Sequence, residues 1–254
     1  MTANSSNENE TRDTILDGRI TLIQPRHGYR FSVEAILLGR FARASTRERV
    51  LELGAGCGVI SIMIAALYRP REVVAIEIQP PLAAMIARSA ELNGLESVHA
   101  VCADLRSERI AGVESASFDL VVANPPYRAA AAGRENPGHG RRLARGESAA
   151  VLADFVAAAR RYARRGARVA FVFTARRSAE LISAMRSNQL EPKRIRFVHP
   201  RTAMPASVML IEARAGGGIE VAIEPPLILY GRPGIYTAEA RALLSSPRLT
   251  ITQT

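Results

Sequence analysis

Cysteine and lysine are scarce in this sequence, and long apolar runs are missing. The two cysteines, Cys57 and Cys102, are too few for a disulfide framework. No group of Cys and His residues has the spacing of metal ligands, so we expect reduced thiols and no bound metal. Lys193 is the single lysine, and arginine carries almost all of the positive charge.

The start of the chain and its apolar segments argue against export and membrane insertion. The first residues read "MTANSSNENETRDT", without the basic segment and apolar stretch of a signal peptide. No apolar run reaches the roughly 20 residues that span a bilayer. We therefore expect a soluble, cytoplasmic protein without a membrane partner. We further expect residues 1–15 to be a disordered leader and residues 16–254 to form a single domain.

The length of 254 residues, 48% of them hydrophobic, suits one large α/β domain. The formal net charge of +10 favours a polyanionic partner. The positive charge is concentrated between residues 128 and 201, where seventeen Arg and Lys residues accompany five Asp and Glu residues, which leaves +12.

Strand-like and helical patterns alternate along most of the chain. The expected strands are "RVLELG", "EVVAIEI", "VHAVCAD", "FDLVVAN" and "ARVAFVF". Helical patterns at about residues 82–93, 149–163 and 178–187 accompany them, which predicts a mostly parallel sheet with helices on both faces. Two later runs, "KRIRFVH" and "SVMLIEA", have no helix between them, so we expect an antiparallel pair there. We expect "GIEVAIEPPLILY" to add an edge strand.

A glycine-rich turn, "VLELGAGCG", joins an expected strand to an expected helix. Its glycines, Gly54, Gly56 and Gly58, allow the backbone to turn sharply and to approach a ligand beside the positive end of the helix. Glu77 ends the next expected strand, where a carboxylate can accept hydrogen bonds from both ribose hydroxyls of an adenosine cofactor. The third glycine comes one residue too early for the dinucleotide fingerprint, which disfavours NAD.

The pattern E-x-G-x-G-x-G, which begins at Glu52, resembles the S-adenosylmethionine loop of class I methyltransferases. The resemblance implies S-adenosylmethionine as the cofactor, with the glycines against its methionine and ribose parts. Asp104 ends "VCAD" and matches the position that in such enzymes binds the adenine amino group. A simple strand-to-helix turn and a helix-capping aspartate are the structural alternatives.

Asn124, Pro125, Pro126 and Tyr127 follow the strand "FDLVVA", at the edge where open α/β sheets bind ligands. A planar exocyclic amine is a poor nucleophile because its lone pair is delocalised. The Asn side-chain oxygen and a backbone carbonyl directed by the prolines can accept its two hydrogens, and the Tyr ring can stack on the planar group. The tetrapeptide therefore predicts methyl transfer to such an amine by positioning, although it is also a strong turn former.

These residues resemble the amino-methylating class I methyltransferases that carry an N-P-P-Y tetrapeptide. More narrowly, the chain from Gln24 to Tyr236 resembles the bacterial tRNA1(Val) adenine-N6 methyltransferase family in "HGYRFSVEAILLGRFA", "RLARGE", "LEPKRIRFVHP" and "PPLILYGRPGIYT". The resemblance implies a Rossmann-like, seven-stranded sheet with its last strand reversed. It also implies S-adenosylmethionine as methyl donor and the N6 amine of the adenine beside the tRNA anticodon as acceptor.

The same resemblance implies that Ser32 and Glu34 contact the methionine end of the cofactor. Relatives usually carry aspartate at the position of Glu34 and histidine at that of Gly146.

The segment that follows Tyr127 has no apolar periodicity until about residue 148, and loops of this length are functional or disordered. We expect its arginines to contact phosphates of a tRNA stem-loop while the target adenine is turned into the NPPY pocket. These arginines are Arg128, Arg134, Arg141, Arg142 and Arg145.

Three other functions use the same features. A protein methyltransferase that acts on a glutamine side-chain amide needs the same NPPY geometry, but such enzymes usually have a sizeable helical domain before the glycine loop. Guanine N2 methylation in ribosomal RNA uses a related tetrapeptide. A non-catalytic RNA-binding protein on this fold is the alternative of another class, and intact Glu77, Asp104 and Asn124 argue against it.

Overall fold

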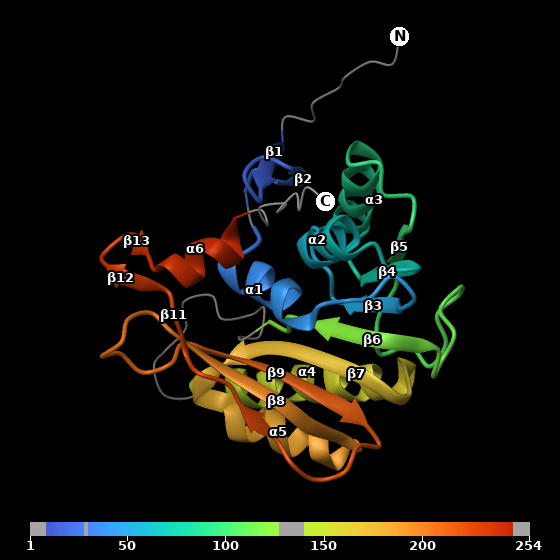
Figure 1. Ribbon diagram of the computed structural model, residues 1–254. Helices are drawn as coiled ribbons and strands as arrows, with labels where there is room; N and C mark the ends of the chain where they lie inside the picture. The colour runs from blue at the N-terminus through green and yellow to red at the C-terminus, as the bar shows by residue number, and fades with distance from the viewer. Residues whose placement is uncertain (1–8, 28–29, 127–139, 246–254) are drawn as a thin grey trace, which may run out of the picture.

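The computed structural model describes residues 9–27, 30–126 and 140–245, with the backbone alone for residues 140–150. A central sheet alternates with helices along the chain (Figure 1). The main strands are β3 (Arg49–Leu53), β4 (Glu72–Glu77), β5 (Val98–Cys102), β6 (Phe118–Ala123), β7 (Ala163–Thr174), β8 (Leu190–His199) and β9 (Val208–Ala215). The helices are α1 (Val33–Ala42), α2 (Val59–Tyr68), α3 (Pro80–Leu92), α4 (Gly140–Tyr162), α5 (Ser178–Ser187) and α6 (Ala238–Leu244).

The seven main strands lie in the order β8-β9-β7-β6-β3-β4-β5. β9 is antiparallel to both of its neighbours, and the other neighbouring pairs are parallel. This confirms the expected seven-stranded, mostly parallel sheet with its last strand reversed. Two short strands, β10 (Ala222–Ile223) and β11 (Leu227–Ile228), extend the sheet by pairing in parallel with β8.

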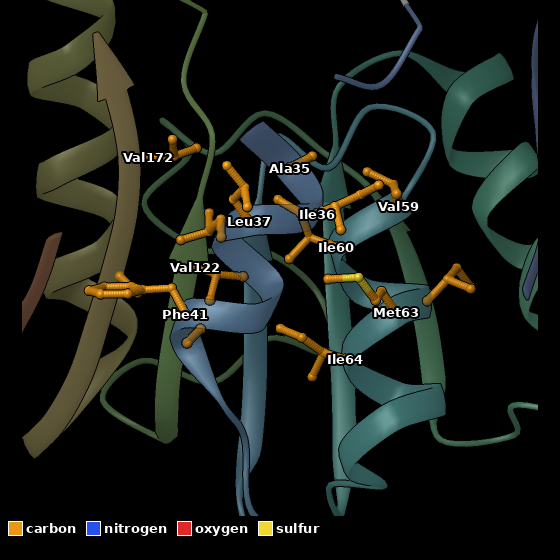
Figure 2. Close-up of a cluster of buried hydrophobic side chains, with 14 of the residues drawn as sticks. Ala35, Ile36, Leu37, Phe41, Val59, Ile60, Met63, Ile64, Val122 and Val172 are labelled. Atoms are coloured by element: carbon orange, nitrogen blue, oxygen red, sulfur yellow. The ribbon is translucent and has the colours of Figure 1, made fainter. Parts of the chain in front are cut away.

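Side chains that alternate along each strand supply two apolar layers. On β6, Leu120 and Val122 pack into the layer under α1, α2, α3 and α6, whereas Val121 and Ala123 pack against α4 and α5. Figure 2 shows the first layer, where Leu37 and Phe41 of α1 lie beside Val122. Burial of each large apolar side chain contributes about 1.5–3 kcal/mol, so both faces hold the sheet in place.

Residues 10–15, which the sequence analysis assigned to a disordered leader, form a strand in the structure, and residues 1–8 lie outside the described residues. β1 (Glu10–Ile15) and β2 (Ile20–Pro25) form an antiparallel hairpin. Its turn contains Asp17 and Gly18, both with positive φ, and Asp-Gly is a strong hairpin signal. The hairpin docks on α3 through hydrogen bonds such as Ile23 N–H to Ser89 Oγ at 2.9 Å.

Helix α4 begins at Gly140, earlier than the expected start near residue 149, so the segment without apolar periodicity is helical in its second half. Residues 127–139 lie outside the described residues.

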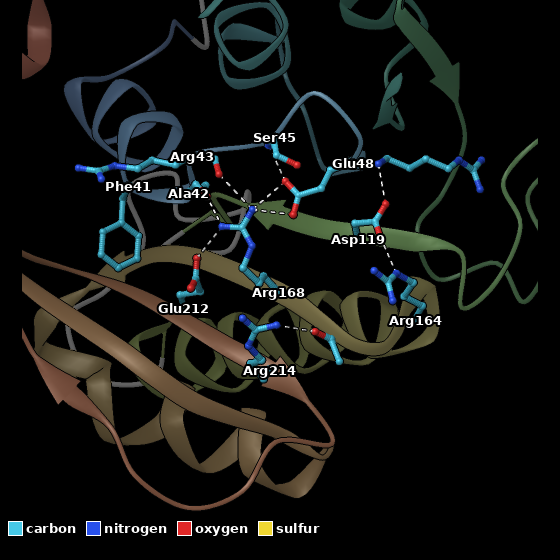
Figure 3. A network of polar contacts seen from close by, with 12 residues as sticks. Phe41, Ala42, Arg43, Ser45, Glu48, Asp119, Arg164, Arg168, Glu212 and Arg214 are labelled. Atoms are coloured by element: carbon cyan, nitrogen blue, oxygen red, sulfur yellow. Dashed lines mark hydrogen bonds and ion pairs between the residues drawn. The ribbon is translucent and has the colours of Figure 1, made fainter. Parts of the chain in front are cut away.

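Most arginines of the basic segment that the structure describes with side chains are bound within the fold. Arg168, whose side chain is 17% exposed, contacts Glu48 at 2.9 Å and Glu212 at 3.2 Å (Figure 3). It also donates to the backbone carbonyls of Ala42 and Arg43, at 2.6 and 3.0 Å. The other ion pairs are Arg164–Asp119, Arg177–Glu180, Arg186–Glu191, Arg194–Glu212, Arg194–Glu224 and Arg196–Glu239.

Both cysteines are free thiols, Cys57 buried and Cys102 exposed. Within the described residues, no group of three or more His, Cys, Asp and Glu side chains is arranged to hold a metal ion. None of the described helices has both the length and the apolar character that crossing a membrane requires.

Candidate active site

One cavity of about 630 Å³ opens at the carboxyl ends of β3, β4, β5 and β6. Parallel strands bring their carboxyl ends to the same edge of the sheet, which is why residues far apart in the sequence meet there. The predicted residues that line the cavity are Ser32, Gly54, Gly56, Glu77, Asp104, Asn124, Pro125 and Pro126.

The glycine-rich loop between β3 and α2 forms one wall of the cavity. Gly54 has a φ of +63°, and a Cβ there would lie 2.7 Å from Cζ of Phe155. Phe155 comes from α4 and also lines the cavity. A side chain at position 54 is therefore excluded both by the backbone conformation and by this ring.

Glu77 links the end of β4 to this loop. Its Oε2 accepts a hydrogen bond from the Gly56 N–H at 2.8 Å, and its Oε1 accepts from the backbone N–H and side chain of Gln79 at 3.0 and 3.2 Å. A carboxylate offers about four lone-pair sites, and these three donors leave one of them, on Oε2, for a ligand hydroxyl. The buried carboxylate is thus oriented by the protein and can still accept a hydrogen bond from a ligand.

Asp104 follows β5 and is paired with a residue that the sequence did not single out. Arg106 donates its backbone N–H to Asp104 Oδ1 at 2.9 Å and its guanidinium to both carboxylate oxygens at 2.5 to 3.0 Å. The hydrogen bonds from Arg106 lower the pKa of Asp104, which keeps the carboxylate ionised. Arg106 also lines the cavity and lies on its exposed side.

Asn124, Pro125 and Pro126 follow β6, whose residue Ala123 is fully buried. Pro125 is buried, and Asn124 is partly exposed at the cavity. The rigid φ of each proline restricts the backbone after the Asn, so the carbonyl groups of this turn have fixed directions. Tyr127, the last residue of the predicted tetrapeptide, lies outside the described residues.

Glu52 is not part of the cavity lining; it is buried beneath the loop. Its Oε2 accepts hydrogen bonds from the Ser61 backbone N–H at 2.8 Å and from the Ser61 hydroxyl. Burial raises the pKa of Glu52 to about 8. The carboxyl group therefore joins the end of β3 to the first turns of α2 and supports the loop from below.

Glu34 and Gly58 also lie away from the lining. Glu34, in the first turn of α1, is close enough to Tyr236 to affect that residue's ionisation electrostatically. Gly58 precedes α2, and a Cβ there would lie 2.8 Å from Ile86 of α3, so this glycine permits close helix packing.

The predicted RNA-contacting arginines are not tested by the structure. Arg128 and Arg134 lie outside the described residues, and Arg141, Arg142 and Arg145 lie on α4, where only the backbone is described.

Sequence reasoning missed four further cavity residues that matter for ligand contact. Ile78 is 55% exposed at the cavity, unusual for a large apolar side chain, and Leu105 lies on the lining as well. Asp154 and Phe155 come from α4, which the chain order separates from the glycine loop by three strands and two helices. Ile78 and Leu105 could have been found from the sequence, since each directly follows a predicted acidic residue, Glu77 or Asp104.

Comparison with known proteins identifies the architecture. The model of the methyltransferase small domain family matches residues 33–187. Two similar curated proteins are both named tRNA1(Val) (adenine(37)-N6)-methyltransferase. The one from a Flavobacteriaceae bacterium is 31% identical over 111 residues, which cover 43% of this chain and 46% of that protein. The one from Pedobacter heparinus is 24% identical over 220 residues, which cover 85% of this chain and 89% of that protein.

Two solved structures extend the comparison. A predicted O-methyltransferase from Agrobacterium tumefaciens has a TM-score of 0.67 and 25% identity, and the match covers 84% of this chain and 97% of that chain. M. jannaschii TYW2, solved in complex with AdoMet, has a TM-score of 0.55 and 17% identity, with 84% and 89% covered. At that identity the second likeness concerns the fold alone.

Proposed function

The chain belongs to the methyltransferase small domain family and is an S-adenosylmethionine-dependent methyltransferase, and on this premise we propose that it methylates the N6 amine of an adenine in tRNA. The observation that supports this most strongly is one cavity that contains both the loop and acid of a methyl-donor site and the Asn-Pro-Pro turn. The two curated relatives, named for adenine 37 of tRNA1(Val), indicate the adenine beside the anticodon as the target.

The residues of the cavity fit S-adenosylmethionine. A volume of about 630 Å³ lies within the usual range for cofactor sites. The Oε2 atom of Glu77 accepts from a ribose hydroxyl, and the exposed Ile78 and the neighbouring Leu105 offer apolar faces to the adenine ring. Asp104 accepts a hydrogen bond from the adenine amino group when Arg106 releases one of its hydrogen bonds to that carboxylate. Ser32, directly before α1, lines the same cavity and contacts the methionine end.

When bound, S-adenosylmethionine supplies a methyl group that passes from sulfur to the amine nitrogen, with the C–S bonding pair left on sulfur and a proton then lost from the nitrogen. The Asn124 side-chain oxygen and a carbonyl of the Pro turn accept the two amine hydrogens, which directs the nitrogen lone pair toward the methyl group. The protein contributes position and hydrogen bonding, and Tyr127 supplies the ring on which the adenine stacks.

The direct test is transfer of labelled methyl from S-adenosylmethionine to unmodified bulk tRNA and to total protein, followed by nucleoside digestion and mass spectrometry. We expect label in 6-methyladenosine from tRNA, and mapping should place it next to the anticodon. Label in protein that resists RNase would instead support glutamine methylation, and label in N2-methylguanosine would support guanine methylation. The variant Asn124→Ala is the negative control for all three substrates.

A further inference from the structure

A flipped base that enters the cavity remains joined to the RNA on both sides, so neighbouring nucleotides must cross the surface at the cavity mouth. This inference rests on the proposed RNA substrate. At the same edge of the sheet as the end of β6, the described surface includes three segments near the carboxyl ends of β7 and β8. They are the 3-10 turn η1 (Ala175–Arg177), residues 200–207, and the hairpin of β12 (Tyr230–Arg232) and β13 (Ile235–Tyr236), which together we name the carboxyl-edge ridge.

The register of the sheet makes this ridge a wall beside the cavity mouth. Ala123, the last residue of β6, pairs with Phe171, and β7 continues for three more residues to Thr174. At about 3.3 Å per residue, β7 therefore extends roughly 10 Å beyond the end of β6, and the ridge lies at and above that level. β8 lies three strand positions from β6, which is roughly 14 Å across. The wall is therefore large enough to contact several nucleotides.

Hydrogen bonds connect the three segments, so the wall is preorganised. The backbone N–H of Ala175 donates to the carbonyl of Ser207 at 3.0 Å, and that of Tyr230 donates to Pro200 at 2.9 Å. Within the hairpin, the rings of Tyr230 and Tyr236 stack with centroids 4.8 Å apart. Figure 1 shows β11, β12 and β13 at the same side of the molecule as the tip of β6.

Each segment of the ridge presents one exposed arginine: Arg176, Arg201 and Arg232. None of the three has an ion-pair partner in the part of the chain that the structure describes. The acidic groups nearby include Glu34, beside Tyr236, and two that are already paired, Glu180 with Arg177 and Glu239 with Arg196, each at 2.5 Å. The guanidinium groups of the ridge are thus available for an external anion, unlike those of Arg168 and Arg194.

We propose that the carboxyl-edge ridge is the docking surface for the RNA that flanks the target base, with Arg176, Arg201 and Arg232 binding its phosphates. Arginine forks match phosphate geometry and keep their charge at any physiological pH. The exposed side chains of Met204 and Ile235 lie on the same segments and offer apolar contacts to riboses or unstacked bases. The ridge combines three cationic side chains with exposed apolar side chains on segments that hydrogen bonds connect, and this chemistry suits a single-stranded loop.

The test compares the unchanged protein with R176A/R201A/R232A and with the control Arg165→Ala. Arg165 is also exposed and without an ion pair among the described residues, but it lies near the start of β7, at the opposite edge of the sheet. Binding of an unmodified tRNA transcript is measured by fluorescence anisotropy at several salt concentrations. Methyl transfer to the same transcript gives KM and kcat, and calorimetry gives affinity for S-adenosylmethionine.

We expect the triple variant to lose at least about tenfold in tRNA affinity and its salt slope to fall by about 2 to 3, since each of the three phosphate contacts contributes roughly 0.7–0.9. KM for tRNA should rise while kcat and cofactor affinity stay close to those of the unchanged protein, and Arg165→Ala should behave like the unchanged protein. If the triple variant fails to bind cofactor, the three single variants provide the same test. The salt slope of tRNA binding should fall by nearly 1 in each of them.

An unchanged salt slope in a triple variant that still methylates tRNA would overturn the docking surface and leave the proposed function in place. A lack of tRNA methylation by the unchanged protein would remove the proposed function, and this inference with it.

Discussion

The carboxylate of Glu77 accepts a hydrogen bond from the backbone N–H of Gly56 at 2.8 Å. This contact fixes the glycine-rich loop to the end of β4, so one side chain both shapes the loop and faces the cavity. Loop geometry and ligand contact are therefore coupled at this residue.

Because of this coupling, two substitutions of Glu77 should differ. Glu77→Gln keeps an oxygen that accepts from Gly56 but loses the charge and one acceptor, so affinity for S-adenosylmethionine should fall about tenfold. Glu77→Ala also releases the loop and should weaken binding further. Calorimetry measures both, and Glu72→Gln, at the other end of β4, is the control. Equal affinity of Glu77→Ala and the unchanged protein would contradict this role.

Asn124→Ala should keep cofactor affinity within about threefold and lower kcat by about a hundredfold or more, in the range seen when one positioned hydrogen-bonding group is removed from an active site. The reason is that, in the proposed mechanism, the lost amide oxygen accepts a hydrogen bond from the methyl acceptor and not from the cofactor. Asn124→Asp keeps an acceptor at the same place and should retain more activity. Calorimetry with S-adenosylhomocysteine and the methyl-transfer assay separate the two effects. Loss of cofactor affinity with turnover intact would show that Asn124 contacts the cofactor and not the methyl acceptor.

Gly54→Ala should destabilise the fold by about 1–3 kcal/mol more than Gly166→Ala, because the added methyl group meets Phe155 as well as an unfavourable backbone. Gly166 has a φ of +78° and open space around its Cβ position, so it reports the backbone effect alone. Urea unfolding measures both costs. A second substitution, Phe155→Leu, should recover part of the loss in Gly54→Ala, and no recovery would assign the cost to the backbone.

Glu52 should make folding stability depend on pH. Its pKa is raised by burial from 4.5 to about 8, so between these values the folded state holds a proton that the unfolded state releases. Stability should therefore decline as the pH rises from about 5 to 8, with a slope of at most about 1.4 kcal/mol per pH unit from this group. Glu52→Gln should remove this contribution. Unfolding curves of both proteins at several pH values check it, and parallel pH profiles would argue against a raised pKa.

Arg168→Met should cost about 3 kcal/mol of unfolding free energy because it removes the guanidinium that pairs with Glu48 and leaves Glu212 with Arg194 as its one ion-pair partner among the described residues, at a site with little solvent. Arg164→Met is the matched control, since the Arg164 side chain is 56% exposed and its pair with Asp119 should contribute less than about 1 kcal/mol. Neither change should alter tRNA affinity. Reduced tRNA binding by a folded Arg168→Met variant would show that this arginine contributes to more than the fold.

The sequence alone determined the layout of the strands and the identity of the residues at their carboxyl ends. Alternation of apolar residues and the order of strands and helices are local properties, and parallel strands necessarily bring their ends to one edge. For this reason Gly54, Glu77, Asp104 and Asn124 were predictable as neighbours, although they lie on four different strand ends. The β1–β2 hairpin also had a local signal in the sequence, the Asp-Gly turn. The polar composition of the first residues nevertheless led to the expectation of a disordered leader.

Only the tertiary structure decided which partner each polar side chain takes. Glu52 belongs to the same motif as Gly54, yet it is buried against Ser61, and Asp104 is paired with Arg106. Phe155 reaches the loop because α4 packs on the face of the sheet where Leu53 points. Charge counted along the sequence likewise did not separate Arg168, bound within the fold, from Arg201, exposed on the ridge. Such pairings depend on strand order and helix packing across long sequence separations, and no local pattern contains that information.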